Sequence, residues 1–221
     1  MGGLDVPGIL RQVAISAVPI LVAITFHEVA HGLAAYKMGD GTAKFSGRLT
    51  LNPLAHIDPI GTVLLPVILL ITTQGQFVFG YAKPVPINPY NFRNPKRDMA
   101  LSAAAGPGMN LALAVACVLL VKLVVNPLSG VLPEAIILPL FLMLRSGVLI
   151  NVVLAAFNLI PVPPLDGGRV LAGFLPIRQA DQLNRLEPYG MIIVIILIMT
   201  GLAGVFITPL IRLFMALLNL L

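Results

Sequence analysis

Long apolar stretches alternate with short polar segments along the whole chain. A helix needs about 20 apolar residues to cross the hydrocarbon core of a bilayer, and several of these stretches reach that length. The pattern predicts an all-α polytopic membrane protein, one membrane-embedded domain with four to six transmembrane or re-entrant helices and the lipid bilayer as its surroundings. The long helices are expected at about 9–38, 100–125, 134–160 and, divided near 204–209, 189–221.

Three shorter segments break this series. The apolar run 61–73 is too short to span comfortably, so the segment 61–80 is expected to be re-entrant. Loose alternation near residues 42–51, and the stretch 77–87, indicate short β-strands near the predicted site. A loop is expected over 161–175, because its prolines cannot continue a helix.

Composition agrees with a membrane protein. Hydrophobic residues make up 58% of the chain and charged residues only 10%, against about 25% charged residues in an average soluble domain. The net charge of +5 does not indicate nucleic-acid binding, because the lysines and arginines flank apolar runs and form no separate patch. Cys117 is the only cysteine, so no internal disulfide can form. The first apolar run continues into charged residues, which favours a retained helix over a signal peptide.

The segment 27–31 (HEVAH) carries the clearest chemistry. Residues i and i+4 share one face of a helix, so His27 and His31 can bind one metal ion, and this spacing suits zinc. Glu28 beside them can take a proton from water and pass it to a leaving amine, as peptide hydrolysis requires. A third ligand must come from His56 or a carboxylate. Mutual pairing of buried polar groups is the alternative, but each ionisable group in a membrane costs about 2.5–3.5 kcal/mol.

Two further motifs follow in the chain, at 105–110 (AGPGMN) and 157–168 (FNLIPVPPLDGG). With the HEVAH segment they make the chain resemble the site-2 protease family of intramembrane zinc metalloproteases. The resemblance extends over most of the length, in a minimal form without a soluble peptide-binding domain. It implies a three-helix catalytic core within the lipid and Zn²⁺ as the cofactor.

The resemblance also implies roles for individual residues. It makes Asp166 the third zinc ligand beside the two histidines, Glu28 the general base, and Asn158 a neighbour of the scissile carbonyl. The residues themselves agree for Asp166, because prolines precede it and glycines follow it where the backbone must bend; a surface-turn aspartate is the alternative. Asn158 either polarises a carbonyl or bonds across helices. For Asn110 and Asn151, helix–helix hydrogen bonding is expected.

His56 has two possible roles. It could gate or occupy the open position of the zinc, or be an ordinary loop histidine bonded to Asp58, and the second is favoured on general grounds.

The predicted function is therefore hydrolysis of peptide bonds in or near the transmembrane segment of a membrane-protein substrate. Such a helix must unwind before it is cut, so the substrate is expected to bind as a strand. The rival hypotheses are a metal-binding membrane transporter, which explains Asp166 but not Glu28, and a noncatalytic zinc-binding membrane scaffold. The sequence contains no Gly-x-Ser-x-Gly motif for a serine protease.

The basic residues predict the topology. Ten of the 14 lysines and arginines lie in three segments, which are 37–48, 83–97 and 169–185, whereas 126–133 has none. Because positive loops stay in the cytoplasm, the active site is expected toward the cytoplasmic side of what is expected to be a prokaryotic plasma membrane. The sequence does not specify the oligomeric state or the substrate.

Overall fold

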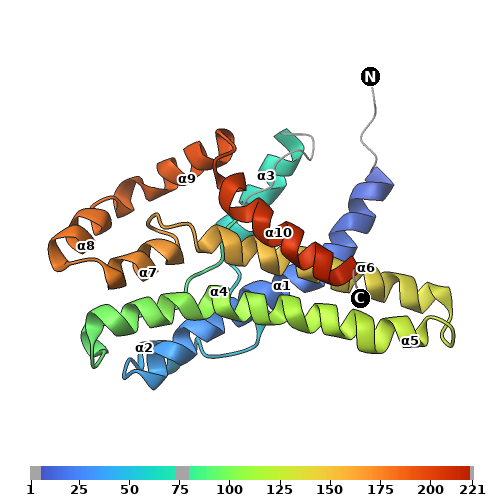
Figure 1. Cartoon of the computed structure of the whole chain (residues 1–221), viewed down its shortest axis with the longest axis horizontal. Helices are drawn as coiled ribbons and strands as arrows, with labels where there is room; N and C mark the ends of the chain where they lie inside the picture. Colours follow the sequence, from blue (N-terminus) through green and yellow to red (C-terminus); the bar gives the residue numbers. More distant parts are fainter. Residues whose placement is uncertain (1–5, 73–79, 220–221) are drawn as a thin grey trace.

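Three long helices form the centre of the computed structural model, which describes residues 6–72 and 80–219. They are α1 (Val6–Lys37), α4 (Pro95–Leu120) and α6 (Glu134–Asn158), and each packs against the other two. A π-helical turn, η4 (Val121–Val125), and α5 (Asn126–Leu128) continue α4. Figure 1 shows α4 and α6 running side by side, with α1 crossing behind them.

Shorter helices surround this centre. They are α2 (Thr42–Phe45), η1 (Pro53–Ala55), η2 (Pro59–Leu64), α3 (Leu65–Thr72), η3 (Pro89–Asn91), α7 (Asp166–Phe174), α8 (Ile177–Asn184), η5 (Glu187–Tyr189), α9 (Gly190–Met199) and α10 (Ala203–Asn219). The largest apolar cluster joins α4, α6 and α10 through small and β-branched side chains such as Ala114, Val148 and Val152, with Phe214 against them. Small residues let helices approach closely without lipid between them.

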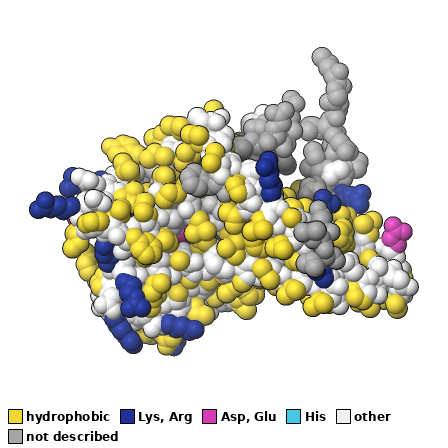
Figure 2. Space-filling model, viewed as in Figure 1, with side chains coloured by type: hydrophobic (Ala, Val, Ile, Leu, Met, Phe, Trp, Pro, Cys, Tyr) yellow, Lys and Arg dark blue, Asp and Glu magenta, His cyan; other side chains and the backbone are white. Residues whose placement is uncertain are grey.

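Within residues 6–72 and 80–219, four helical segments are long and apolar enough to cross a membrane: Val13–Lys37, Pro95–Leu128, Glu134–Asn158 and Ile177–Met199. Hydrophobic side chains cover most of the surface in Figure 2, while lysines and arginines gather at the end of the molecule that holds α2 and α8. The prediction of an all-α polytopic protein is confirmed, and the protein is integral to a membrane.

The expected β-strands are wrong for the described residues, none of which form a strand. Thr42–Phe45 is a single helical turn, and Thr42 at its start donates to the Asp40 carboxylate, a local bond that competes with strand pairing. Residues 80–88 form neither helix nor strand, and Pro84 and Pro86 lack the amide donors that a strand ladder needs. Residues 77–79 lie outside the described part.

Two boundaries also differ from expectation. The loop predicted over 161–175 ends at Leu165, and α7 begins with Asp166 itself. The C-terminal block divides at residues 200–202, where Gly201 has a φ of +75°, rather than near 204–209. This left-handed conformation favours glycine, and it ends α9.

Asp40 fixes the turn after α1. Its fully buried carboxylate accepts hydrogen bonds from the Thr42 amide and hydroxyl, the Asn91 side chain and the Asn88 amide. Burial raises the pKa of Asp40, but the hydrogen bonds from Thr42, Asn91 and Asn88 outweigh it and hold this pKa below its ordinary value. The carboxylate thus ties the end of α1 to the segment that leads into α4.

We predict that Asp40→Asn lowers the thermal unfolding midpoint at neutral pH, because an amide cannot accept all these bonds and its NH₂ faces donors. A depressed native pKa stabilises the fold above the unfolded value of about 3.9 and loses that contribution as the pH falls through the native value. The difference between wild type and variant, measured by thermal unfolding in detergent, should therefore persist above about pH 4 and narrow below it. A difference that does not change with pH would contradict this role.

Candidate metal centre

Three potential ligand atoms converge between α1 and α7. The Nε2 atoms of His27 and His31 are 3.0 Å apart, and each lies 3.2 Å from Oδ2 of Asp166. All three side chains are buried. A tetrahedral zinc ion with bonds of about 2.0–2.1 Å separates its ligand atoms by about 3.3–3.4 Å. The triangle therefore has nearly the size that a zinc ion requires, and the structure brings the three predicted ligands together.

Hydrogen bonds at the far side of each imidazole determine which nitrogen faces the triangle as an acceptor. His31 Nδ1 lies 2.7 Å from the Ser102 carbonyl, which only accepts, so the proton is on Nδ1. His27 Nδ1 lies 2.5 Å from Oδ1 of Asn110. The Asn110 NH₂ donates to the Ala23 carbonyl and to Asn151, which leaves its oxygen to accept from His27.

Both Nε2 atoms consequently present lone pairs to each other and to a carboxylate oxygen. Among the described residues, no hydrogen-bond donor satisfies Oδ2 of Asp166. Three converging acceptors repel one another unless a cation lies between them. Two neutral imidazoles with fixed tautomers and one carboxylate are a donor set that fits zinc, so the residues present suit this metal.

Gly106 of α4 makes room for the imidazoles. A Cβ atom at this position would overlap ring atoms of both His27 and His31. The glycine is therefore required by the close approach of α4 to the metal-binding face of α1.

Asn110 and Asn151 form the expected helix–helix hydrogen bonds, but Asn110 does more. It links Ala23 of α1 and Asn151 of α6, and its oxygen orients the imidazole of His27. The position of Asn110 at the end of the AGPGMN motif was the feature of the sequence that could have indicated this role. The Ser102 carbonyl, by contrast, is a backbone atom, and no pattern of residue types predicts its role.

Glu28 lies in the same pocket without being near enough to join the ligand triangle. The pocket has a volume of about 470 Å³, and His27, His31, Glu28 and Asp166 all line it. Oε2 of Glu28 accepts a hydrogen bond of 2.8 Å from the backbone amide of Val85. One carboxylate oxygen is thus occupied, and lone pairs on the other are available for a proton.

Asn158 also lines this pocket, at the end of α6. Its NH₂ donates to the Leu154 carbonyl of its own helix at 2.9 Å, so the cross-helix bond that was one alternative is not what the described residues form. The second N–H of the amide remains available to the pocket.

His56 is held elsewhere. It is buried, its Nε2 lies 2.9 Å from the Thr50 carbonyl, and its own carbonyl accepts from the Lys83 amide. The favoured hypothesis of a bond to Asp58 is wrong, because the Asp58 carboxylate caps η2 by accepting from the amides of Ile60 and Gly61. Nor does His56 line the metal pocket.

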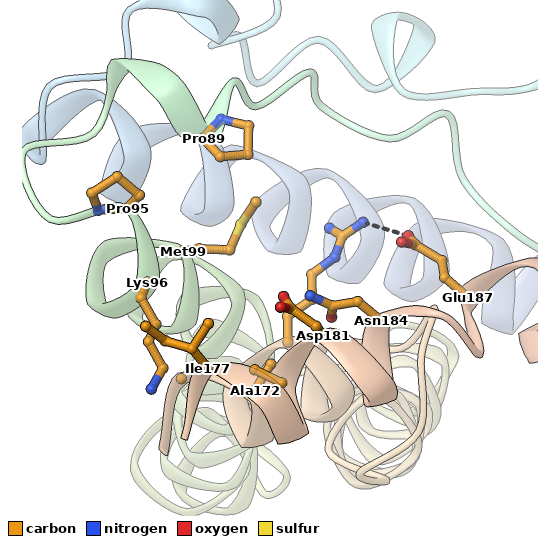
Figure 3. A pocket seen from close by; sticks show the side chains of 12 residues that line it. Pro89, Pro95, Lys96, Met99, Ala172, Ile177, Asp181, Asn184 and Glu187 are labelled. Atoms are coloured by element: carbon orange, nitrogen blue, oxygen red, sulfur yellow. Dashed lines mark ion pairs between the residues drawn. The ribbon is translucent and has the colours of Figure 1, made fainter. Parts of the chain in front are cut away.

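A second pocket of about 460 Å³ adjoins the first, and Met99 and Arg169 line both. Figure 3 shows its polar wall, where Arg169 pairs with Glu187 at 3.5 Å beside Asp181 and Asn184. Both partners are roughly half exposed, so this ion pair contributes little to stability. The metal pocket therefore borders an opening that contains charged side chains such as Arg169 and Glu187, at the end of the molecule that carries α8.

Comparison with known proteins agrees with this site. The model of peptidase family M50 matches residues 133–201. "Putative zinc metalloprotease YwhC" of Bacillus subtilis is 36% identical over 195 residues, which cover 88% of this chain and 84% of that protein. The chain belongs to peptidase family M50. It is thus a zinc metalloprotease of the intramembrane, site-2 type, and zinc is its cofactor.

Other relatives of this M50 peptidase are longer. The Rip2 protein of Mycolicibacterium smegmatis, which has the same type of name, is 31% identical over 180 residues, or 81% of this chain and 64% of that protein. The Rip2 protein of Mycobacterium tuberculosis is 29% identical over 177 residues, with 80% and 63% covered. This chain therefore spans slightly less than two thirds of the Rip2 proteins. No solved structure gives a significant match.

We predict one zinc ion per chain of this M50 peptidase, measured by elemental analysis of the purified protein. Asp166→Ala and His31→Ala should each abolish stoichiometric zinc, because each leaves only two ligands. Full zinc occupancy in the double variant would exclude this ligand set.

Asn110→Ala should weaken zinc binding by about 10–100-fold without removing a ligand, because His27 loses the acceptor that orients it. Competition with a chelator measures the affinity. Asn151→Ala is the matched control: it removes a partner of Asn110 but no group that contacts a ligand, so its effect should be smaller.

Proposed function

We propose that this M50 peptidase cuts the transmembrane segments of other membrane proteins, with His27, His31 and Asp166 as zinc ligands and Glu28 as the general base. The observation that supports this most is the meeting of three acceptor atoms and a separate carboxylate in one pocket that membrane helices line. A transporter or a scaffold would give the ligands a role but leave Glu28 without one.

The chemistry follows from the groups in this pocket. Bound zinc would polarise the scissile carbonyl and make water easier to deprotonate. Glu28 takes the proton of the attacking water on the carboxylate oxygen that Val85 does not occupy, and the water oxygen bonds to the carbonyl carbon. The same carboxyl then delivers this proton to the leaving nitrogen as the C–N bond breaks. Asn158 can donate its free N–H to the carbonyl oxygen.

The short helix α3 indicates where a substrate could enter. From Pro59 to Thr72 the chain is helical but spans at most about 21 Å, less than a hydrocarbon core of about 30 Å. A nearly apolar cavity of about 640 Å³ lies between α3 and α9, and Tyr81 and Met191 line both this cavity and the metal pocket. A re-entrant segment 61–80 that acts as a gate, with substrate entering between α3 and α9, fits these features of its described part; residues 73–79 lie outside the described residues.

Orientation in the membrane follows from charge. The ends of α1 and α4 near the metal pocket, and the segment after Asp166, carry the three basic segments described above. Positive loops stay on the cytoplasmic side, which is where we place the active site, in a prokaryotic plasma membrane. The pocket beside Arg169 would then give water access from the cytoplasm.

We predict that Glu28→Gln keeps the fold and the zinc but lowers cleavage by about 10²–10⁴-fold or more, the usual range for loss of a general base. The measurement compares fragments of membrane proteins in cells that express wild type or variant, together with the zinc content of both. Comparable cleavage by the two proteins would exclude this mechanism, and zinc loss would make Glu28 a ligand instead.

The topology predicts the reactivity of single cysteines in a Cys117→Ser background. Ser46→Cys and Tyr90→Cys, both at exposed positions, should resist an impermeant thiol reagent added to intact cells, whereas Ser129→Cys should react. All three should react after the membrane is permeabilised. Labelling of residue 90 but not residue 46 from outside would mean that 61–80 crosses the membrane, and would eliminate the gate.

A further inference from the structure

Residues 80–88, which we call the strap, form neither helix nor strand and line one wall of the metal pocket. The strap is attached to the protein along its length. The Tyr81 amide donates to the Gly61 carbonyl and the Lys83 amide to the His56 carbonyl, both at 3.0 Å. At its far end the Asn88 amide donates to Asp40 at 2.7 Å. These bonds fix the backbone on both sides of its central residues.

The centre of the strap is Pro84-Val85-Pro86. Because proline has no amide hydrogen, Val85 carries the only backbone donor of these three residues. A residue before proline is also restricted to extended conformations, which limits how this donor can turn. The sequence therefore presents one N–H group in a fixed direction, and that group donates to Oε2 of Glu28 at 2.8 Å.

The opposite side of the strap is also held. The Arg48 guanidinium donates to the carbonyl of Lys83 at 2.7 Å and lies 3.4 Å from that of Pro84. The Val85 side chain is buried against α1 at Gly32, where an added Cβ would lie 3.0 Å from Cγ1 of Val85. The missing side chain at Gly32, next to His31, thus lets the strap approach the helix that carries Glu28.

We propose that the Val85 amide is a positioning group for catalysis, which holds one oxygen of Glu28 so that the other is presented for proton transfer. This inference rests on the proposed role of Glu28. A glutamate has three side-chain torsions, and a charge-assisted hydrogen bond from a fixed donor removes most of that freedom before the substrate binds. His56 and Arg48 act indirectly, since they hold the strap.

An amide-to-ester substitution at Val85 tests the proposal. Incorporation of the α-hydroxy analogue of valine into the full chain replaces the N–H by oxygen and keeps the side chain. We expect kcat on a single-span membrane reporter to fall about 10–100-fold, the range for loss of a hydrogen bond to a charged group, while KM and zinc content stay within about twofold. Val85→Ala keeps the N–H but removes packing. The kcat of this variant should therefore be at least tenfold higher than that of the ester variant.

A cycle with Glu28→Gln separates positioning from a general disturbance of the strap. If the amide acts through Glu28, the ester should add little to the loss that Glu28→Gln already causes. If the strap only shapes the pocket, the ester should lower the residual activity of the Glu28→Gln protein by the same factor as in wild type, and the proposal fails.

Hydrogen exchange gives a readout that does not depend on cleavage. In the zinc-loaded wild type, the amide of Val85 should exchange more slowly than that of Ile87, which has no recorded acceptor among the described residues, and Glu28→Ala should remove the difference. Rapid exchange at Val85 in wild type would overturn the inference. An inactive wild type with a protected Val85 amide would instead refute the proposed proteolysis and leave the contact intact.

Discussion

Three acceptor atoms directed at one point are the constraint around which this protein is built. The lone pairs of two Nε2 atoms and one carboxylate oxygen lie within 3.2 Å of one another in a buried site, and the carboxylate oxygen has no donor among the described residues. Only a cation makes such an arrangement favourable. The packing of α1, α4 and α6 serves it directly. Gly106 admits the imidazoles, while the Ser102 carbonyl and Asn110 fix their tautomers from behind.

In the proposed mechanism, a second requirement is that the Glu28 carboxylate stays available as a base. Glu28 is adjacent in sequence to His27, yet it faces the strap and not the triangle. The strap is held by groups far apart in sequence, from Asp40 to His56, so the orientation of the base depends on the loops after α1 as well as on α1 itself. His56 does not line the metal pocket, but it affects the orientation of Glu28 because its carbonyl holds the strap.

The sequence predicted side-chain chemistry well and backbone chemistry poorly. The length of the apolar runs identified the membrane helices, and the histidine spacing with the Pro-Leu-Asp-Gly-Gly segment selected the residues that the structure brings together. Their catalytic roles remain predictions. What was missed depends on main-chain atoms, such as the Ser102 carbonyl and the Val85 amide. The expected strands failed for a related reason, because prolines and local bonds to Asp40 decided conformations that hydrophobic alternation did not reveal.

The turn before α7 fixes the position of Asp166 as closely as a helix would. Residues 159–165 fold over the start of α7 so closely that a Cβ at Gly167 would overlap the carbonyls of Leu159 and Ile160, and one at Gly168 would overlap Pro163. Prolines end α6 and stiffen the turn, and glycines let the next helix begin directly beneath it. Asp166 is the first residue of that helix, so the regular helical backbone orders its buried side chain. A carboxylate from a flexible loop would pay the entropy of ordering when the metal binds, whereas this one is already in place.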